Sequence, residues 1–400
     1  MRVLHISFAA SGGAGVAAGR SVLALQQAGV DAQLITANDF RRPRWTRLRA
    51  KLDAYPLRFY NRRRLFSEWS NNWMPSLLAP RIKALAPDII HVHWAGAGFL
   101  GIADLKAFGV PIVWTMHDAW PFTGGCHYPA NCSGFRSRCG CCPQLSSRRS
   151  ADLSRFNFNR KQRIRSQIQR WISPSRWLAD LASDAGIPAD RTRVVPNGVD
   201  GGIYTPAHRE MARHELGLAE ADIVLLAGAH DLTERRKGAG IYQIAVSHIR
   251  SAVNRRCVAY VFGSNASQGM IAAGISTVGV VSGDLAVARL LSAADVLLLP
   301  SLQDNLPNIA VEAQACGLPV VGFDSGGLRE IVHDSVTGRL VSAFEASALA
   351  RATVEWLNGT DRGNVSVLCR SRFERHFQLG SHAANLVAVY QELVKDGRAT

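Results

Sequence analysis

The chain has 400 residues, a formal net charge of +15 and a composition that is 47% hydrophobic and 19% charged. This length suits two domains better than a single core, and the composition excludes a disordered chain. No apolar run approaches the ~20 residues of a membrane span, and the first residues lack the features of a signal peptide, so we expect a cytoplasmic protein.

The positive charge lies in the first half of the chain. Up to Thr192 there are 27 Lys and Arg against 11 Asp and Glu, and after it 19 against 20. Segment 41–64 carries ten basic residues, and segment 136–176 carries eleven. The aromatic residues interleaved with the first segment are Trp45, Tyr55, Phe59 and Tyr60. This mixture favours a peripheral contact with an anionic membrane surface, while a solvated basic face is the structural alternative. No nucleic-acid-binding motif accompanies it, so we expect no nucleic acid.

Strand and helix patterns alternate along the chain, which predicts a doubly wound α/β architecture. In the first half we expect strands over 3–8, 31–36, 88–93 and 111–116, and a helix over 15–28. The pattern restarts after about residue 192, with strands expected over 223–227, 258–262, 278–281, 296–299 and 319–323. Helical segments are expected over 240–253, 285–293 and 381–395.

The restart predicts two Rossmann-like domains joined near 188–200, where Pro196-Asn197-Gly198 has the turn chemistry of a hinge. The first domain covers 1–192 and carries a Cys-rich insertion at 126–142. The second covers 193–375. A C-terminal helix over 376–400 is expected to pack back on the first domain.

The segment 300–330 places Asp304 and Asn305 in a loop between a strand and a helix that begins near Pro307. Such a loop offers backbone N–H groups and a helix dipole to phosphates at the carboxyl end of a parallel sheet. Glu312 lies one to two turns into that helix, and a carboxylate suits bidentate bonding to vicinal sugar hydroxyls. Taken alone, the two residues favour the structural alternative, with Asp304 as a helix-start residue and Glu312 as a solvated one, because acidic residues are common near helix starts.

The whole segment closely resembles the signature of retaining glycosyltransferase family four: an acidic residue, seven intervening residues, Glu, then Ala-x-Ala-Cys-Gly-x-Pro-Val-Val. The wording Gln-Asp-Asn-Leu-Pro-Asn is similar to the branch that builds exopolysaccharides such as colanic acid. The resemblance implies a GT-B fold, with two Rossmann-like domains facing each other across a cleft. It implies that Asp304 contacts the transferred sugar and Glu312 holds the ribose. Asp304 replaces the usual Glu, which leaves the identity of the sugar open.

The remaining donor-site residues follow from the same resemblance. The helix start with Asn305, Leu306 and Asn308 would hold the diphosphate, together with Lys237. The family pairs this lysine with an arginine just after a strand-terminal glycine, but Ala229 follows Gly228 here. Arg236 or its neighbour Arg235 is the expected replacement, and exposed loop charge is the alternative for both.

Two further elements come from the first half. Gly12 and Gly13 open the first helix, where glycine lets the backbone approach a pyrophosphate or sugar closely. A tight structural turn is the alternative, and the spacing does not match a dinucleotide fingerprint. His117 ends a strand at its carboxyl side and, by the resemblance, assists the oxocarbenium-like transition state. A lone histidine is otherwise more often structural.

Five of the eight cysteines fall within 126–142. In a reducing compartment such a cluster favours metal over disulfides, so Cys126, Cys132, Cys139 and Cys142 are the candidate ligands of a structural zinc, with unligated thiols or a redox disulfide as alternatives. No Asp-x-Asp motif occurs, and we expect catalysis to need no cofactor.

The resemblance implies a retaining transferase that moves a hexose from a UDP- or GDP-sugar to an acceptor. We expect the acceptor to be a polyprenyl-diphosphate-linked glycan in exopolysaccharide biosynthesis, at the inner face of the plasma membrane, and the basic first half of the chain supports this expectation. A nucleotide-sugar epimerase on the same fold, or a non-enzymatic nucleotide-sugar or nucleic-acid binder, is the alternative.

Overall fold

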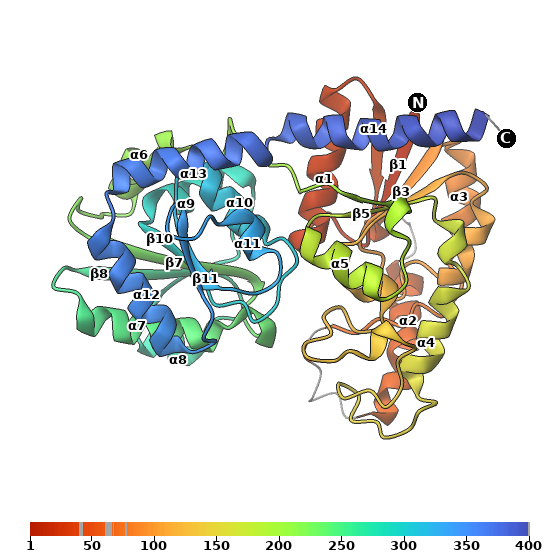
Figure 1. Cartoon of the computed structure of the whole chain (residues 1–400), viewed down its shortest axis with the longest axis horizontal. Helices are drawn as coiled ribbons and strands as arrows, with labels where there is room; N and C mark the ends of the chain where they lie inside the picture. The colour runs from red at the N-terminus through yellow and green to blue at the C-terminus, as the bar shows by residue number, and fades with distance from the viewer. Residues whose placement is uncertain (40–42, 61–65, 67, 77, 399–400) are drawn as a thin grey trace. The chain divides into compact units, whose positions relative to one another are not determined.

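The structure is a computed structural model that describes residues 1–39, 43–60, 66, 68–76 and 78–398. Residues 41, 42 and 61–64 of the basic segment lie outside the described residues. The chain divides into two compact units (Figure 1): unit 1 comprises Met1–Gly198 and Gly380–Thr400, and unit 2 comprises Val199–Leu379.

Unit 1 is built on a six-stranded parallel sheet in the order β2-β1-β3-β4-β5-β6. The strands are β1 (Arg2–Ile6), β2 (Asp31–Ile35), β3 (Ile89–Val92), β4 (Ile112–Thr115), β5 (Arg170–Ser173) and β6 (Thr192–Val194). Its helices are α1 (Gly12–Gln27), α2 (Pro43–Ala54), α3 (Leu78–Ala84), α4 (Leu153–Gln162), α5 (Arg176–Asp184) and α14 (Leu379–Arg398). The four expected strands are present with trimmed ends, whereas β5 and β6 were not predicted.

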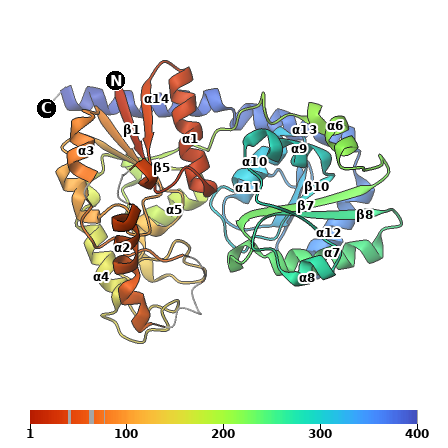
Figure 2. The ribbon, with the colours of Figure 1, turned by 180° about the vertical axis from the view of Figure 1, so that it is seen from behind.

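Alternation along these strands builds two cores, because successive side chains point to opposite faces of a sheet. Leu4 and Ile90 belong to the core that includes α3 and the loops around Phe99. Val3 and Ile89 belong to the core closed by α1 and α14, where Leu386, Val389, Tyr390 and Leu393 are buried. Figures 1 and 2 both show α14 running beside β1 and α1. The last residues of the chain therefore complete unit 1.

Unit 2 repeats the arrangement with the order β12-β11-β10-β7-β8-β9, again all parallel. The strands are β7 (Ile223–Asp231), β8 (Cys257–Ser264), β9 (Ser276–Gly279), β10 (Val296–Leu299), β11 (Val320–Phe323) and β12 (Gly338–Val341). The helices are α6 (Arg209–Glu215), α7 (Ala239–Ala252), α8 (Gln268–Ala272), α9 (Asp284–Ala293), α10 (Asn308–Ala315), α11 (Leu328–Ile331), α12 (Ala346–Gly359) and α13 (Arg362–His376). The strand expected over 278–281 begins two residues earlier, and β12 was not predicted.

The helices of unit 2 cover both faces of its sheet. Leu225 and Val261 pack with α7 and α12 in one core, while Val224 and Leu297 pack with α9, α10 and α13 in the other. The doubly wound α/β architecture expected from the sequence is thus confirmed in both units. Among the described residues, no helix is both long and apolar enough to cross a membrane.

Candidate functional site

An ion-pair cluster lies at the carboxyl end of the unit 2 sheet. Asp304 follows β10 and is only 7% exposed. Its Oδ2 accepts a hydrogen bond from Lys237 Nζ at 2.5 Å, and its Oδ1 lies 3.3 Å from Arg236 Nη1. Arg236 is held in turn by Glu234, whose Oε1 accepts from Arg236 Nε at 2.6 Å. Three of the predicted site residues therefore meet in one place.

The neighbours of Asp304 decide its charge. Burial alone would raise the pKa of this carboxyl, but Lys237 and Arg236 outweigh burial and lower the pKa to about 2. The backbone N–H of Asn305 also donates to Oδ1, at 3.0 Å. Asp304 is therefore a carboxylate at any physiological pH, and its position is set by two cations and a backbone amide.

Two glycines let the surrounding backbone close on this cluster. A Cβ at Gly326, where φ is +60°, would lie 1.7 Å from the backbone oxygen of Asp304. A Cβ at Gly238, where φ is +70°, would lie 2.2 Å from the backbone oxygen of Pro300. Both positions require glycine, because real side chains never approach so closely. The loops that carry Lys237 and Asp304 are thus fixed against each other.

Helix α10 follows directly. Pro307 is its N-cap and Asn308 its first residue, one residue later than expected. Leu306 and Glu312 are buried, at 6% and 7% exposure, and Asn308 is half-buried. The alternatives in which Asp304 starts the helix and Glu312 is solvated are wrong. The start of α10 still points its first N–H groups towards the carboxyl edge of the sheet.

The family has an arginine just after the strand-terminal glycine, where this chain has Ala229, and the structure distinguishes the two candidate replacements. Strand β7 continues past Gly228 and Ala229 to Asp231, with a register shift against β8 over this stretch. Arg235 is exposed, whereas the Arg236 side chain is only 11% exposed and lies beside Asp304. Of the two candidate replacements, Arg236 is the one that reaches the cluster.

In unit 1 the predicted glycines lie where β1 passes into α1. Gly12 has φ of +72° and is the first residue of α1. Among the described residues, no atom lies within 4 Å of the place that a Cβ would take at Gly12 or Gly13. Gly15, by contrast, packs tightly, because its Cβ would lie 2.4 Å from the Ala9 oxygen. The turn thus depends sterically on Gly15, whereas Gly12 and Gly13 have room for a side chain.

His117 follows β4 at the carboxyl edge of the same sheet and is half-buried. Burial lowers the pKa of His117 to about 4, although the nearby Asp118 opposes this shift. Its Nε2 lies 2.9 Å from Nδ1 of His93, so its ring is held by a second histidine. His117 is therefore neutral at physiological pH.

Sequence reasoning missed the residues behind His117. His5, His91 and His93 are buried, at 0%, 0% and 2% exposure, and one ring nitrogen from each lies within 4.8 Å of the other two. His5 and His91 are direct partners in the β1–β3 register. The available signal was the alternation of the strands, since His5 follows Val3 by two positions and His91 follows Ile89 by two, which puts both on one face.

The Cys-rich insertion forms a looped segment beside α4. None of the eight cysteines is in a disulfide. Burial, together with Cys139 and Cys142, raises the pKa of the Cys126 thiol, which indicates that these sulfurs are neighbours. Within the described residues, however, no three cysteine sulfurs lie within 4.8 Å of one another. The four candidate ligands therefore gather without forming a closed tetrahedral site.

Several residues counted in the basic segments are structural. Arg49 is 6% exposed and donates to the backbone oxygen of Met74 at 3.1 Å. Lys161 is 2% exposed, donates to the backbone oxygen of Trp120 and lies 3.8 Å from the centre of its indole ring. Some of the charge in these segments is therefore buried and belongs neither to a membrane contact nor to the alternative of a solvated basic face.

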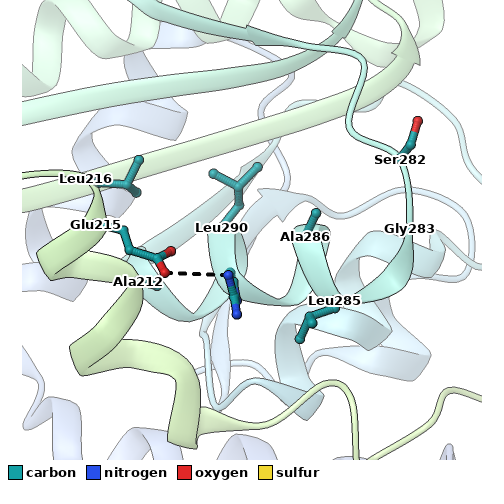
Figure 3. Close-up of a pocket in the computed structure, with 9 residues that line it drawn as sticks. Ala212, Glu215, Leu216, Ser282, Gly283, Leu285, Ala286 and Leu290 are labelled. Carbon is teal, nitrogen blue, oxygen red and sulfur yellow. Dashed lines mark hydrogen bonds and ion pairs between the residues drawn. The ribbon is translucent and has the colours of Figure 1, made fainter.

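An open hollow of about 420 Å³ lies between α6 and α9 of unit 2 (Figure 3). It is lined by Leu216, Leu285, Ala286 and Leu290, with Glu215 and Arg289 paired at 3.5 Å. None of the predicted site residues lines it. We assign the site from the ion-pair cluster rather than from this hollow.

Comparison with known proteins agrees with this architecture. The family description Glycosyltransferase Family 4 matches residues 11–201, and Glycosyl transferases group 1 matches residues 221–359. A D-inositol 3-phosphate glycosyltransferase from Thermobispora bispora is 27% identical over 324 residues, which are 77% of this chain and 71% of that protein. The putative colanic acid biosynthesis glycosyl transferase WcaC from Escherichia coli K12 is 26% identical over 285 residues, 67% of each chain.

Among solved structures, Anabaena Alr3699/HepE in complex with UDP superposes with a TM-score of 0.67 at 18% identity, covering 98% of this chain and 100% of that one. The two parallel α/β units and these matches define a glycosyltransferase of the GT-B fold. The chain carries a Glycosyltransferase Family 4 domain over residues 11–201 and a Glycosyl transferases group 1 domain over residues 221–359.

The buried histidines predict a loss of stability in mild acid. Burial lowers the pKa of His5 to about 3 and that of His117 and His382 to about 4. An unfolded histidine titrates near 6.5, so these groups confer stability above pH ~6.5 that is lost as the pH falls towards 4. Each of these histidines should lower the free energy of unfolding by about 1.4 kcal/mol for each pH unit in this window. We expect Tm to fall clearly between pH 7 and 5 in calorimetry of the full chain.

A substitution of His382 tests the contribution of one buried histidine to this loss of stability in acid. It bonds Ser21 and the backbone oxygen of Pro196 within unit 1. His382→Asn should lower Tm at pH 7.5 but make the decline with acid shallower. An unchanged Tm from pH 7 to 5 in the parent chain would contradict the assignment of these histidines as neutral.

Proposed function

We propose that this protein transfers a hexose, with retention of anomeric configuration, from a nucleoside diphosphate sugar to a lipid-linked glycan. One observation carries the proposal: a buried carboxylate, Asp304, is held ionised by Lys237 and Arg236 directly before the start of α10. Such a cluster offers both parts of a donor site, a fixed carboxylate for a sugar hydroxyl and cations for a diphosphate.

The chemistry of the cluster supports this reading. An ammonium group carries three N–H donors, and Asp304 Oδ2 takes one of those of Lys237, at 2.5 Å. The others can bond phosphate oxygens without releasing the carboxylate. Cations that are already in place stabilise the charge that develops on a departing diphosphate, because no reorganisation is needed during the reaction. The N–H groups at the start of α10 add to the same effect.

Glu312 would recognise the nucleoside. It lies in the buried face of α10, four residues after Asn308, and a carboxylate can accept from both hydroxyls of a ribose. Asn305 and Leu306 would line the path between ribose and diphosphate, and Asp304 would orient the hexose. UDP is the first nucleotide to test, because the similar Anabaena protein binds it; GDP is the second.

Unit 1 would supply the acceptor side. His117 and the turn at Gly12 and Gly13 lie at the carboxyl edge of its sheet, where a sugar could be held. The relatives differ in their acceptors, since one is named for inositol 3-phosphate and another for colanic acid. We propose a polyprenyl-diphosphate-linked glycan and a role in exopolysaccharide biosynthesis, on the basis of the surface described next.

The membrane side of the proposal rests on an aromatic–cationic surface of unit 1, made of Tyr55, Arg58, Phe59, Phe156 and Arg160. Phe59 is 73% exposed, Phe156 57% and Tyr55 51%. Arg58 lies 4.9 Å from the Tyr55 ring centre. Arg160 lies 5.6 Å from that of Phe156, but it is half-buried and also donates to the backbone oxygen of Asn72 at 3.2 Å. The two halves of the surface are joined, because the Leu153 N–H at the start of α4 donates to the Tyr60 hydroxyl at 3.1 Å. Exposed aromatic rings beside arginines suit an anionic lipid headgroup region.

We also propose a structural zinc held by Cys126, Cys132, Cys139 and Cys142. Cys142 packs with Leu57 and Leu145 beneath the aromatic–cationic surface, so a metal here would brace that surface. Zinc would draw the sulfurs closer than they lie in the described residues, and it would take no part in the transfer.

The donor site is tested by a panel of UDP- and GDP-sugars in thermal shift. A true donor at 100 times its Kd should stabilise the protein by about 2.7 kcal/mol. Glu312→Gln should weaken binding of that nucleotide about 10- to 150-fold, since hydrogen bonds to a charged group contribute about 1.5–3 kcal/mol. Titration calorimetry measures the loss.

Glu355→Gln is the matched control, because Glu355 is exposed on α12 and should leave binding unchanged. Equal affinity of the Glu312 variant and the parent would contradict the ribose assignment. Incubation with donor alone, followed by analysis of the sugar, separates transfer from epimerisation.

The membrane surface is tested by vesicle flotation. The double change Phe59→Ser and Phe156→Ser should reduce binding to anionic vesicles at least about tenfold, because each buried ring contributes about 1.5–3 kcal/mol. Val367→Ser, at a residue 67% exposed on α13 of unit 2, is the control and should bind like the parent. Equal flotation of the parent with neutral and anionic vesicles would argue against an electrostatic contact.

The zinc proposal predicts about one zinc per chain by elemental analysis of protein purified without chelator. Cys139→Ser should lose the metal and lower Tm, while Cys141→Ser should keep it, because Cys141 is exposed and outside the proposed set. The site would be refuted if the purified protein contained no zinc and its Tm did not change after treatment with a chelator.

A further inference from the structure

A continuous chain of hydrogen bonds runs from His117 into unit 1. His117 Nε2 lies 2.9 Å from His93 Nδ1, and His93 Nε2 lies 2.8 Å from His5 Nδ1. His5 Nε2 lies 3.5 Å from the hydroxyl of Tyr390 on α14. The same hydroxyl lies 2.6 Å from His91 Nδ1, and His91 Nε2 lies 2.7 Å from Thr115 Oγ1. Every ring nitrogen of the three inner histidines is used once.

We call the chain of hydrogen bonds from His117 to Thr115 the relay. It explains the three inner histidines better than a metal site does, although one nitrogen from each lies within 4.8 Å of the other two. The rings of His91 and His93 stack at 4.4 Å with an interplanar angle of 24°, so their nitrogens do not converge on one point. A cation would also have to break the bonds of rings that are already satisfied. Burial lowers the pKa of all three below the ordinary value, which keeps them neutral.

Neutrality couples the protons along the relay. A neutral imidazole has one N–H donor and one acceptor nitrogen, and a tyrosine hydroxyl has one proton. Each inner group therefore donates on one side and accepts on the other, so all the protons point the same way. With the hydroxyl proton of Tyr390 used inside the relay, only two arrangements exist, and they place opposite tautomers at His117.

The two bonds of the Tyr390 hydroxyl favour one arrangement, in which His91 Nε2 donates to Thr115 Oγ1 at 2.7 Å. A separation of 2.6 Å is typical of an O–H donor and is short for an N–H donor, which favours the hydroxyl donating to His91. The 3.5 Å bond to His5 is then an N–H of His5 donating to the Tyr390 oxygen. The reverse arrangement would assign the hydroxyl proton to the longest bond of the relay.

We infer that Tyr390 is a positioning residue which, through His5 and His93, holds His117 as the Nε2–H tautomer with Nδ1 as a hydrogen-bond acceptor. His117 would then accept a bond from a hydroxyl group of a bound sugar. The role of that bond in transfer rests on the proposed function, but the tautomer does not. Tyr390 would thus make the C-terminal helix part of the machinery around His117.

The tautomer is measured directly by ring ¹⁵N NMR of the full chain labelled at histidine, with His117→Asn used to assign the signal. We expect a protonated Nε2 and an unprotonated Nδ1 in the parent protein. A proton on Nδ1 of His117 would overturn the inference without any variant being needed.

Tyr390→Phe keeps the ring and removes the hydroxyl. His5 and His91 then lose their common partner, so His117 should become a mixture of tautomers, and kcat should fall about 10- to 100-fold with KM for the nucleotide sugar almost unchanged. Tyr242→Phe is the matched control: this hydroxyl of unit 2 is equally buried and bonds the Tyr260 oxygen at 2.8 Å, and its loss should move neither signal nor kcat.

The NMR signal of His117 and the value of kcat distinguish two ways in which the inference could fail. An unchanged His117 tautomer in a folded Tyr390→Phe protein would overturn the relay. A changed tautomer with unchanged kcat would support the relay and refute the participation of His117 in transfer.

Discussion

The parallel register of the two sheets is the constraint on which the rest of the structure depends. Parallel strands bring all their carboxyl ends to one edge, so residues far apart in sequence meet there whenever they follow a strand. Asp304 follows β10, and Lys237 follows β7, the neighbouring strand. His93 follows β3 and His117 follows β4, again neighbours. Each cluster is thus a consequence of strand order.

The two clusters solve the problem of buried polar groups in different ways. In unit 2 the buried groups are charged, and their charges are paired before a ligand arrives, as Asp304 is with Lys237 and Arg236. In unit 1 the buried groups are neutral, and hydrogen bonds satisfy them one by one. Both arrangements avoid leaving a buried polar group without a hydrogen bond, which would cost about 1–3 kcal/mol and more for a charged group. The first suits binding of a charged ligand, and the second suits orientation of a single ring.

Much of the fold and part of the candidate site could be predicted from the sequence, wherever the signal is local. Apolar runs of four to six residues ending in polar ones located the four expected strands of unit 1, and the 300–330 segment identified the loop and helix that hold Asp304 and Glu312. Strands β5, β6 and β12 were missed because they are three or four residues long and carry arginines, for example Arg170 in β5 and Arg339 in β12. Burial of Asp304 was missed for another reason, since its partner Lys237 is 67 residues away.

The histidine relay marks the limit of such reasoning. The alternation that puts His5 and His91 on one face is readable in the sequence, and so is the helical spacing of α14, but no local pattern says that Tyr390 meets them. That contact needs the register of β1 with β3 and the return of the last helix to the first strand, across 385 residues. A contact between residues this far apart in the sequence carries the entropic cost of closing the chain between them. The geometry of His117 therefore depends on completion of unit 1 by α14, and the last residues of the chain belong to the site as much as the loops that surround it.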